Sequence, residues 1–306
     1  MSRFESLGEL KEVRTPAGPI RYRERGTGEP IVFVHGLLVN GDLWRNVVPA
    51  LSAHYRCVTP DLPLGGHDLP MNADADLSPA GLAEILVAFL DAIGLERATL
   101  VANDTGGAVS QLVAVSHPER IERLVLTPCD CFDIFPPKLF NYLKLVARVP
   151  GGLYVLGQSA RLPAMQRLPL AFGWLAKRAI DARAVSSYLE PGLRNAAVRR
   201  DTAKFCKTVS PRYTIEAAKK LPGFDRPVLL VWAREDKLFP LAYAERLART
   251  FPDAKLVTVD DSYTFVPEDR PEELARIIAD FIAARPVEAA RPRVAAAGPR
   301  PVSPRA

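Results

Sequence analysis

Residues 100–121 read LVANDTGGAVSQLVAVSHPERI. The stretch begins with a continuous apolar run, which is typical of a strand buried on both faces. Small residues follow at Gly106, Gly107 and Ala108, and apolar residues then recur until His117. The pattern predicts a strand, a tight turn at Asp104 and a helix that ends near His117.

Asp104 occupies the turn of this predicted strand–turn–helix unit. A nucleophile elbow holds a reactive residue at such a turn, between small residues that let the helix pack closely, and is usually spelled G-x-S-x-G. The turn reads A-N-D-T-G over residues 102–106. A helix N-terminus favours an anion, and a carboxylate can attack carbon to give an ester. The plainer alternative is that Asp104 only caps the helix. The alternation of strands and helices around it favours the elbow.

Strand and helix patterns alternate over most of the chain. The segment 77–94 predicts a helix with Ser78 as its cap, Pro79 in its first turn and Gly94 at its end. Strands that alternate with helices predict an α/β fold with a mostly parallel, eight-stranded sheet covered by helices on both faces. The predicted strands lie within 10–16 and 19–26, which form a hairpin around Ala17-Gly18-Pro19, and within 31–36, 55–62, 98–104, 123–130, 228–236 and 255–261.

One long segment lacks a buried strand. Residues 135–212 contain three helix-like stretches, 138–149, 171–180 and 199–209. We expect a mainly helical lid over the carboxyl edge of the sheet. The expected organisation is therefore a first core part at 1–134, the lid at 135–212, a second core part at 213–284 and a tail at 285–306.

The composition excludes several classes of protein. The tail consists mainly of Pro, Ala and Arg, which predicts disorder, and its five arginines and one glutamate give +4 of the net +5. The folded part has no basic stripe with interleaved aromatics, so we expect no nucleic-acid partner. No run reaches the roughly 18 apolar residues of a membrane span, and the N-terminus resembles no signal peptide, which predicts a cytoplasmic protein without a membrane partner. Four cysteines do not form a disulfide framework, and the C-x-C at Cys129 and Cys131 is more typical of buried thiols than of a metal site.

Residues 9–284 resemble the α/β-hydrolase superfamily. The N-D-T-G-G of the turn resembles the branch with an aspartate nucleophile, the epoxide hydrolases and haloalkane dehalogenases, in which this motif often reads H-D-W-G. The resemblance implies carboxylate attack on a C–O or C–halogen bond and hydrolysis of the resulting ester by a water that a histidine activates. It also implies a lid with Tyr or Trp donors and no cofactor or metal.

The family's functional residues match several positions of this sequence. The resemblance implies that Asp104 is the nucleophile and that Asp236, in A-R-E-D-K-L-F-P, is the acid that orients the histidine. The backbone N–H groups of Thr105 and Leu37 correspond to the oxyanion hole. His35, in the preceding His-Gly, corresponds to a residue that holds the loop.

The departures from the family concern its chemistry. The family's histidine lies in a segment like D-x-G-H-F-V-P, and residues 261–267 read DSYTFVP, so that Thr264 occupies its position. Thr105 replaces the tryptophan that binds halide in dehalogenases, and Leu38 replaces the proline of the H-G-x-P pattern. Loss of the base from a hydrolytic triad can lower kcat by about 10⁶. We expect the carboxyls of Asp104 and Asp236, without an imidazole between them, to repel and at least one pKa to rise.

Other residues could supply the missing functions. His67 lies in a loop near the elbow and is a candidate base or substrate contact, with a local structural role as the alternative. His54 and His117 fit a polar loop and a helix end. Asp130 and Asp133, after the strand that ends near residue 126, could orient a base instead of Asp236. In the lid, four aromatic residues are candidate donors to a leaving group or plain packing residues: Tyr142, Tyr154, Trp174 and Tyr188.

Two classes of function follow. The first is an enzyme on a small, largely apolar substrate, with Asp104 as nucleophile or general base. Its family expectation is hydrolysis, and a lyase or cyclase type of reaction fits the absent histidine better. The second is a degenerate hydrolase that binds a ligand without turnover. The sequence leaves the substrate and the oligomeric state open.

Overall fold

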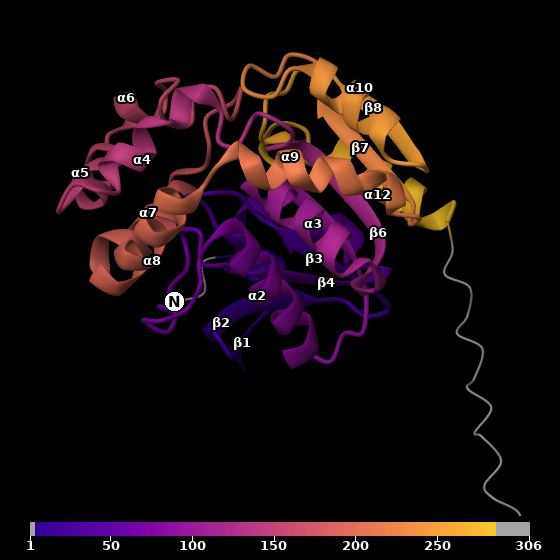
Figure 1. The fold of residues 1–306 in the computed structure, drawn as a ribbon, viewed down its shortest axis with the longest axis horizontal. Helices are drawn as coiled ribbons and strands as arrows, with labels where there is room; N and C mark the ends of the chain where they lie inside the picture. Colours follow the sequence, from indigo (N-terminus) through magenta and orange to yellow (C-terminus); the bar gives the residue numbers. More distant parts are fainter. Residues whose placement is uncertain (1–3, 286–306) are drawn as a thin grey trace, which may run out of the picture.

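The computed structural model describes residues 4–285 and contains one eight-stranded sheet with the order β1-β2-β4-β3-β5-β6-β7-β8 (Figure 1). β1 pairs antiparallel with β2 and β2 with β4, whereas all other neighbours are parallel. This confirms the predicted α/β-hydrolase fold and its mostly parallel sheet. The strands are β1 (Glu9–Thr15), β2 (Gly18–Arg25), β3 (Glu29–Val34), β4 (Tyr55–Pro60), β5 (Ala98–Asp104), β6 (Ile121–Cys129), β7 (Val228–Ala233) and β8 (Ala254–Val259).

The central strands bring the candidate residues to one edge of the sheet. β5 and β7 are buried along their whole length, as expected of strands covered on both faces. Leu37 follows β3, Asp104 ends β5, Asp130 follows β6 and Asp236 follows β7. These four strands are neighbours and parallel, so their carboxyl ends meet at the edge where α/β proteins bind ligands.

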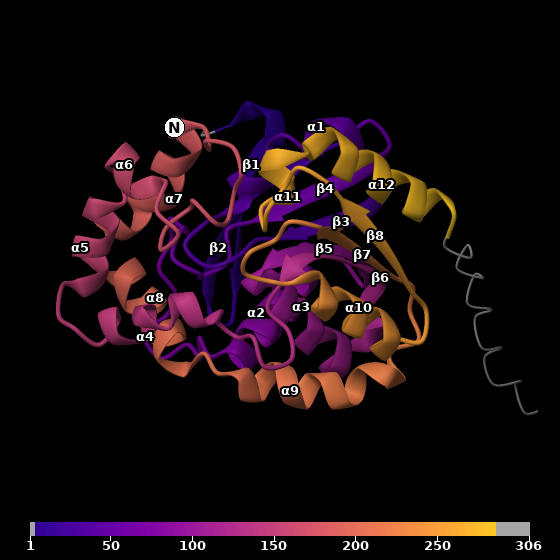
Figure 2. The same cartoon turned by 90° about the horizontal axis from the view of Figure 1, so that it is seen from above.

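Helices cover both faces of the sheet. α1 (Val48–Leu51), α11 (Val266–Asp269) and α12 (Pro271–Ala283) lie on one face, and α2 (Pro79–Ala92), α3 (Thr105–Ser116), α9 (Pro211–Lys220) and α10 (Leu241–Thr250) lie on the other (Figure 2). Ser78 caps α2, as predicted, by accepting a hydrogen bond from Gly81 N at 3.2 Å. Short 3₁₀ helices span Glu5–Leu7, Gly41–Trp44, Pro118–Arg120, Lys138–Phe140 and Leu221–Gly223.

A set of helices between β6 and β7, which we call the lid, lies beyond one end of the sheet (Figure 1). Residues 171–180 are not helical, contrary to prediction, because Asp269 and Phe265 engage their backbone: Lys177 N donates to Asp269 Oδ1 at 3.0 Å, and Phe265 N donates to Leu175 O at 2.6 Å. The predicted boundary at residue 212 falls inside α9, which packs on α3. The lid helices are α4 (Tyr142–Val146), α5 (Gly152–Ser159), α6 (Pro163–Gln166), α7 (Ala182–Arg194) and α8 (Ala196–Thr208).

The predicted tail lies almost wholly outside the described residues. Its first residue, Arg285, belongs to the folded part, because Arg123 Nε donates to Arg285 O at 2.8 Å and the Arg285 guanidinium pairs with Asp253. The predicted tail therefore begins one residue too early. All four cysteines are buried and free. Within residues 4–285, no helix has the length and apolar character needed to cross a membrane.

Candidate active site

Asp104 lies at the turn between β5 and α3 in a conformation that few non-glycine residues adopt. Its φ is +51° and its ψ is −129°, and such strain costs about 1–3 kcal/mol where the surroundings enforce it. The backbone packs closely on both sides. A Cβ atom at Gly36 would lie 2.1 Å from Asp104 Oδ2, and one at Gly106 would lie 2.4 Å from Val34 O. Glycine is therefore required at positions 36 and 106, because a side chain there would clash with Asp104 or with the backbone of β3.

Two backbone N–H groups hold the Asp104 carboxyl. Leu37 N donates to Asp104 Oδ2 at 3.1 Å, and the N–H of Thr105 also stabilises the charged form. Burial raises the pKa of Asp104 to about 6, against the lowering effect of these two donors. The sequence-predicted pair of donors, Leu37 and Thr105, is therefore present at the Asp104 carboxyl.

His35 fixes the loop that carries Leu37. Its Nε2 accepts from Leu62 N at 2.9 Å, so Nδ1 carries the proton and donates to Gly36 O at 2.8 Å. Burial lowers the pKa of His35 to about 4, which keeps the imidazole neutral. The loop itself is strained, since Leu38 has a φ of +59°.

A largely apolar cavity of about 110 Å³ lies above Asp104, between the sheet edge and the lid. An engineered apolar cavity of about 150 Å³ holds benzene, so this space suits a small apolar group. The polar residues Asp104, Thr105 and Asp130 form part of its wall. Its apolar wall includes Leu37, Leu38, Pro136, Phe140, Leu143, Leu153, Leu156, Leu170, Phe172, Leu175, Leu189 and Leu193.

Asp130 is the second carboxyl of the cavity. Its Oδ2 accepts from the Thr105 hydroxyl at 3.0 Å, whereas its Oδ1 is buried and has no hydrogen-bond partner. Burial, together with the charge of Asp104, raises the pKa of Asp130 well above its usual range. Burial of Asp130 therefore favours its protonated, neutral form.

Asp236 lies behind the cavity, next to Thr264. Its Oδ1 accepts from Leu238 N and Phe239 N at 2.7 Å each. Burial raises the pKa of Asp236 to about 7, opposed by these two donors and the Thr264 hydroxyl and assisted by the charge of Asp104. The Thr264 hydroxyl is near enough to lower this pKa, although neither it nor Asp236 Oδ2 has a partner in hydrogen-bond geometry. Thr264 thus neighbours Asp236 but offers no nitrogen that titrates.

None of the four histidines lines the cavity, and all four lie within the described residues. His67 Nδ1 accepts from Gly65 N at 3.2 Å, and its Nε2 lies 3.4 Å from Asp201 Oδ2 on α8. Both of its nitrogens are therefore engaged in local structure. His54 is exposed, and His117 Nε2 lies 2.9 Å from Glu84 at the end of α3.

The model of the alpha/beta hydrolase family matches residues 31–277. The chain belongs to the α/β-hydrolase family. It is 30% identical over 274 residues to haloalkane dehalogenase 2 of Mycobacterium tuberculosis, covering 85% of this chain and 90% of that protein. It is 28% identical over 290 residues to the cis-3-alkyl-4-alkyloxetan-2-one decarboxylase of Xanthomonas campestris, and the match covers 89% of this chain and 95% of that protein.

Solved structures show the same fold. An α/β-hydrolase-fold protein from Burkholderia ambifaria superposes with a TM-score of 0.73 at 23% identity, covering 90% of this chain and 97% of that one. A thermophilic esterase from Thermogutta terrifontis superposes with a TM-score of 0.69 at 20% identity, and the match covers 90% of this chain and 99% of that one.

The lid tyrosines of this α/β hydrolase are engaged elsewhere. Tyr142 and Tyr188 line the cavity, but the Tyr142 hydroxyl donates to Leu170 O at 2.7 Å and that of Tyr188 donates to Glu268 Oε1 at 3.2 Å. The two other candidates, Tyr154 and Trp174, do not line the cavity, and Asp133 is exposed and accepts from Tyr243.

Two residues of the site were not singled out from the sequence. Asn103 Nδ2 donates to Thr264 O at 2.8 Å and so fixes the loop beside Asp236. The sequence signal for Asn103 was its place as a polar residue directly after the apolar run 98–102. Arg199 lines the cavity from α8, and its Nη1 donates to Gly192 O at 2.7 Å. No sequence motif around Arg199 predicts a place in the cavity wall.

Proposed function

We propose that this α/β hydrolase uses Asp104 as a nucleophile on a small, largely apolar substrate, in a reaction that consumes no activated water. One observation carries the proposal: the Asp104 carboxyl is held by two backbone donors at the floor of an apolar cavity that no histidine lines. A covalent ester can form at such a site, because one carboxyl oxygen stays in the donor pair while the other attacks. Hydrolysis of that ester would need a base that Thr264 does not supply.

Ring opening and decarboxylation of a β-lactone meets these conditions. Its substrate class is that named for the Xanthomonas campestris relative, a 3,4-dialkyl oxetan-2-one. An Asp104 oxygen attacks ring carbon 4, and the bond from that carbon to the ring oxygen breaks, so that the electron pair forms a carboxylate. The product of this step is an alkyl ester of Asp104.

The second step releases Asp104 without water. The bond between ring carbon 3 and the liberated carboxylate breaks, and its electron pair forms the carbon–carbon double bond. The ester C–O bond breaks at the same time and returns its pair to Asp104. The products are an alkene and carbon dioxide, and the cycle needs neither a proton nor a base.

The other two carboxyls have raised pKa values, and neither has to act as a base in this scheme. Asp130 lines the cavity, and its raised pKa favours the protonated form, which can donate a hydrogen bond to the carboxylate that ring opening liberates. Asp236 lies outside the cavity wall and holds the turn after β7 through its bonds to Leu238 and Phe239.

Incubation with a cis-3,4-dialkyl oxetan-2-one in ¹⁸O-labelled water tests the proposal. We expect alkene and carbon dioxide by gas chromatography–mass spectrometry, no ¹⁸O in Asp104 by peptide mass, and no product with Asp104→Asn. A wild-type protein that forms neither alkene nor a covalent adduct with this lactone would refute the lactone assignment.

Dehalogenation is the second candidate, because the Mycobacterium tuberculosis relative is named for it. A 1-bromoalkane and an epoxide should stop at an Asp104 ester, visible as a stable mass increase of the intact protein. Steady release of alcohol or diol, with ¹⁸O entering Asp104, would instead show that water is activated by a group other than histidine. Binding of all three ligands without any adduct would indicate a degenerate hydrolase.

A further inference from the structure

The lid carries most of the exposed large apolar side chains of the protein. Within residues 4–285, ten such side chains are exposed, and eight of them lie between residues 145 and 170. Val155 is 66% exposed and Leu145 65%. Scattered exposed apolar residues are normal, but a concentration on one segment marks a surface that is covered in use. The eight are Leu145, Val149, Tyr154, Val155, Leu162, Met165, Leu168 and Leu170.

The same segment is exclusively basic in its charged residues. Residues 134–180 contain seven lysines and arginines and no aspartate or glutamate. The whole chain carries +5 and residues 285–306 carry +4, so all the remaining residues together carry −6. The positive charge of the folded part is therefore concentrated on the lid.

Most of these basic groups have no acidic partner. Lys177 and Arg178 pair with Asp261 at the base of the lid. Among the residues that the structure describes, the other five form no ion pair: Lys138, Lys144, Arg148, Arg161 and Arg167. Unpaired cations beside exposed aliphatic side chains are the composition of a surface that binds anionic lipid.

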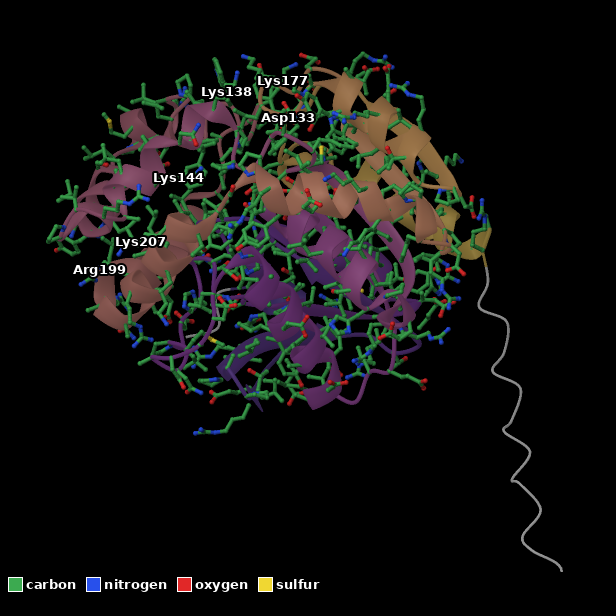
Figure 3. The ribbon with its side chains drawn as sticks, viewed as in Figure 1. Asp133, Lys138, Lys144, Lys177, Arg199 and Lys207 are labelled. Carbon is green, nitrogen blue, oxygen red and sulfur yellow. The ribbon has the colours of Figure 1, made fainter. Side chains whose placement is uncertain are left out.

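The arrangement presents this surface outward. α5 and α6 lie at the outer end of the lid, farthest from the sheet in both views (Figures 1 and 2). Of the basic residues of this segment, Lys138 and Lys144 lie on the lid side of the molecule (Figure 3).

α5 also connects the outer surface with the cavity. Leu153 and Leu156 line the cavity, whereas Tyr154 and Val155 on the same helix are exposed. Apolar side chains thus lead from the outside of the lid to the space above Asp104.

We propose that the outer face of the lid, residues 144–170, docks on an anionic lipid bilayer. The exposed aliphatic groups enter the interface between headgroups and acyl chains, and the unpaired basic groups contact lipid phosphates. Charge complementarity favours this partner. A second copy of the chain would bring two basic lids together, and a nucleic acid offers little to aliphatic side chains. The proposal concerns a partner, replaces the expectation from the sequence that the protein has no membrane partner, and goes beyond the reaction assigned to Asp104.

Vesicle flotation of the full-length protein tests the proposal. Vesicles of equal parts phosphatidylcholine and phosphatidylglycerol should carry the protein upward, and vesicles of phosphatidylcholine alone should carry much less. Binding should weaken as salt is raised from about 0.1 M to about 1 M, where the Debye length falls from about 10 Å to about 3 Å.

Charge-reversal variants locate the surface. Arg161→Glu/Arg167→Glu should lower the partition coefficient about tenfold or more, since each basic residue near an anionic surface contributes about a fivefold factor. Lys220→Glu/Arg249→Glu, an equal charge change at exposed positions away from the lid, should leave it within about twofold. Val155→Ser/Leu168→Ser should also weaken binding without changing net charge.

Three results would overturn the proposal. The first is absence of flotation by wild-type protein. The second is equal loss in the lid and control charge variants, which would show that net charge or the basic residues after 285 bind the lipid. The third is a lid-dependent dimer by light scattering with no vesicle binding, which would make this face a contact between copies. None of these readouts requires turnover, so they are independent of the reaction proposed for Asp104.

Discussion

The hydroxyl of Thr105 donates a 3.0 Å hydrogen bond to Oδ2 of Asp130, which joins the first residue of α3 to the end of β6. Thr105 also supplies one of the two N–H groups at the Asp104 carboxyl. Thr105, the residue directly after Asp104, therefore contacts both carboxyls of the cavity. The Asp104 carboxyl has backbone donors, whereas the Asp130 carboxyl has only this hydroxyl, and burial raises its pKa.

Asp130→Asn should become more stable, relative to wild type, as pH rises from 5 to 8. The folded-state pKa of Asp130 is raised well above that of the unfolded chain, so between the two pKa values the folded wild type holds a proton that the unfolded chain has lost, and its stability falls as pH rises. The asparagine variant has no carboxyl to hold this proton. Urea unfolding at the two pH values should show a relative gain above about 1 kcal/mol, the equivalent of one pKa unit.

A matched control is available for this measurement. Asp133→Asn removes a carboxyl three residues away that is exposed, and should show no comparable change between the two pH values. A constant difference between wild type and Asp130→Asn across this window would mean that Asp130 is ionised in the fold.

The rate of covalent reaction at Asp104 should rise with pH. The carboxylate is the nucleophilic form, and its pKa is raised to about 6, so the reactive fraction increases about tenfold from pH 5 to pH 7. Intact-protein mass spectrometry after mixing with a 1-bromoalkane gives the single-turnover rate at each pH. A half-maximal rate near pH 4 would show that burial does not perturb Asp104.

Replacement of His67 by alanine should lower stability and leave the Asp104 adduct rate unchanged. The imidazole joins the Gly65 backbone to Asp201, which is fully buried on α8 and also accepts from Met71 N at 2.8 Å. Loss of a buried hydrogen-bond partner costs about 1–3 kcal/mol. A His67→Ala protein that keeps its melting temperature but loses the adduct would reassign this histidine to the reaction.

The strands were predictable because each central one is a continuous apolar run. Such a run is the local consequence of burial on both faces, and it places the residues after it at one edge of the sheet. Asp104 was identified at the turn after such a run, and the resemblance to the hydrolase family then implied roles for Asp236, Leu37 and Asp130. The elbow added its own local signal, since residue 106 had to be small for α3 to approach β3.

The lid and the state of the carboxyls were less predictable because long-range contacts decide them. Residues 171–180 have helical composition, yet their N–H groups bind Asp269, some 90 positions away. The pairing of His67 with Asp201 is equally distant in sequence. Repulsion between Asp104 and Asp236 was expected, but the pKa of Asp130 is raised as well, and the burial that raises it depends on the packing of α3 against β6.

Truncation after Pro286 should leave the melting temperature unchanged, whereas truncation after Ala284 should lower it. Arg285 O accepts from buried Arg123, and the Arg285 side chain pairs with Asp253. Removing the acceptor of a buried guanidinium costs about 1–3 kcal/mol, and each kcal/mol lowers Tm by about 2 °C or more in a chain of this size. Differential scanning fluorimetry of the two truncated chains and the full chain checks this. Equal melting of both truncated chains would show that Arg123 finds another acceptor.

Thr264→His should restore hydrolysis of the Asp104 ester. Thr264 is fully buried beside Asp236, whose Oδ2 has no hydrogen-bond partner, so an imidazole at this position finds an acceptor for one ring nitrogen. The other nitrogen would then activate water at the ester. The backbone of the loop is fixed independently of this side chain, by Asn103 Nδ2 at Thr264 O and by Phe265 N at Leu175 O.

The cost of this change is steric. Histidine is larger than threonine, and overpacking a buried site costs about 1–3 kcal/mol, so Thr264→Gln, of similar size but without a titrating nitrogen, is the matched control. After reaction with a 1-bromoalkane, we expect the adduct to persist in wild type and in Thr264→Gln and to decay in Thr264→His, with ¹⁸O from labelled water entering Asp104. A folded Thr264→His protein that forms the adduct and never clears it would show that position 264 does not lie between Asp236 and the ester carbon.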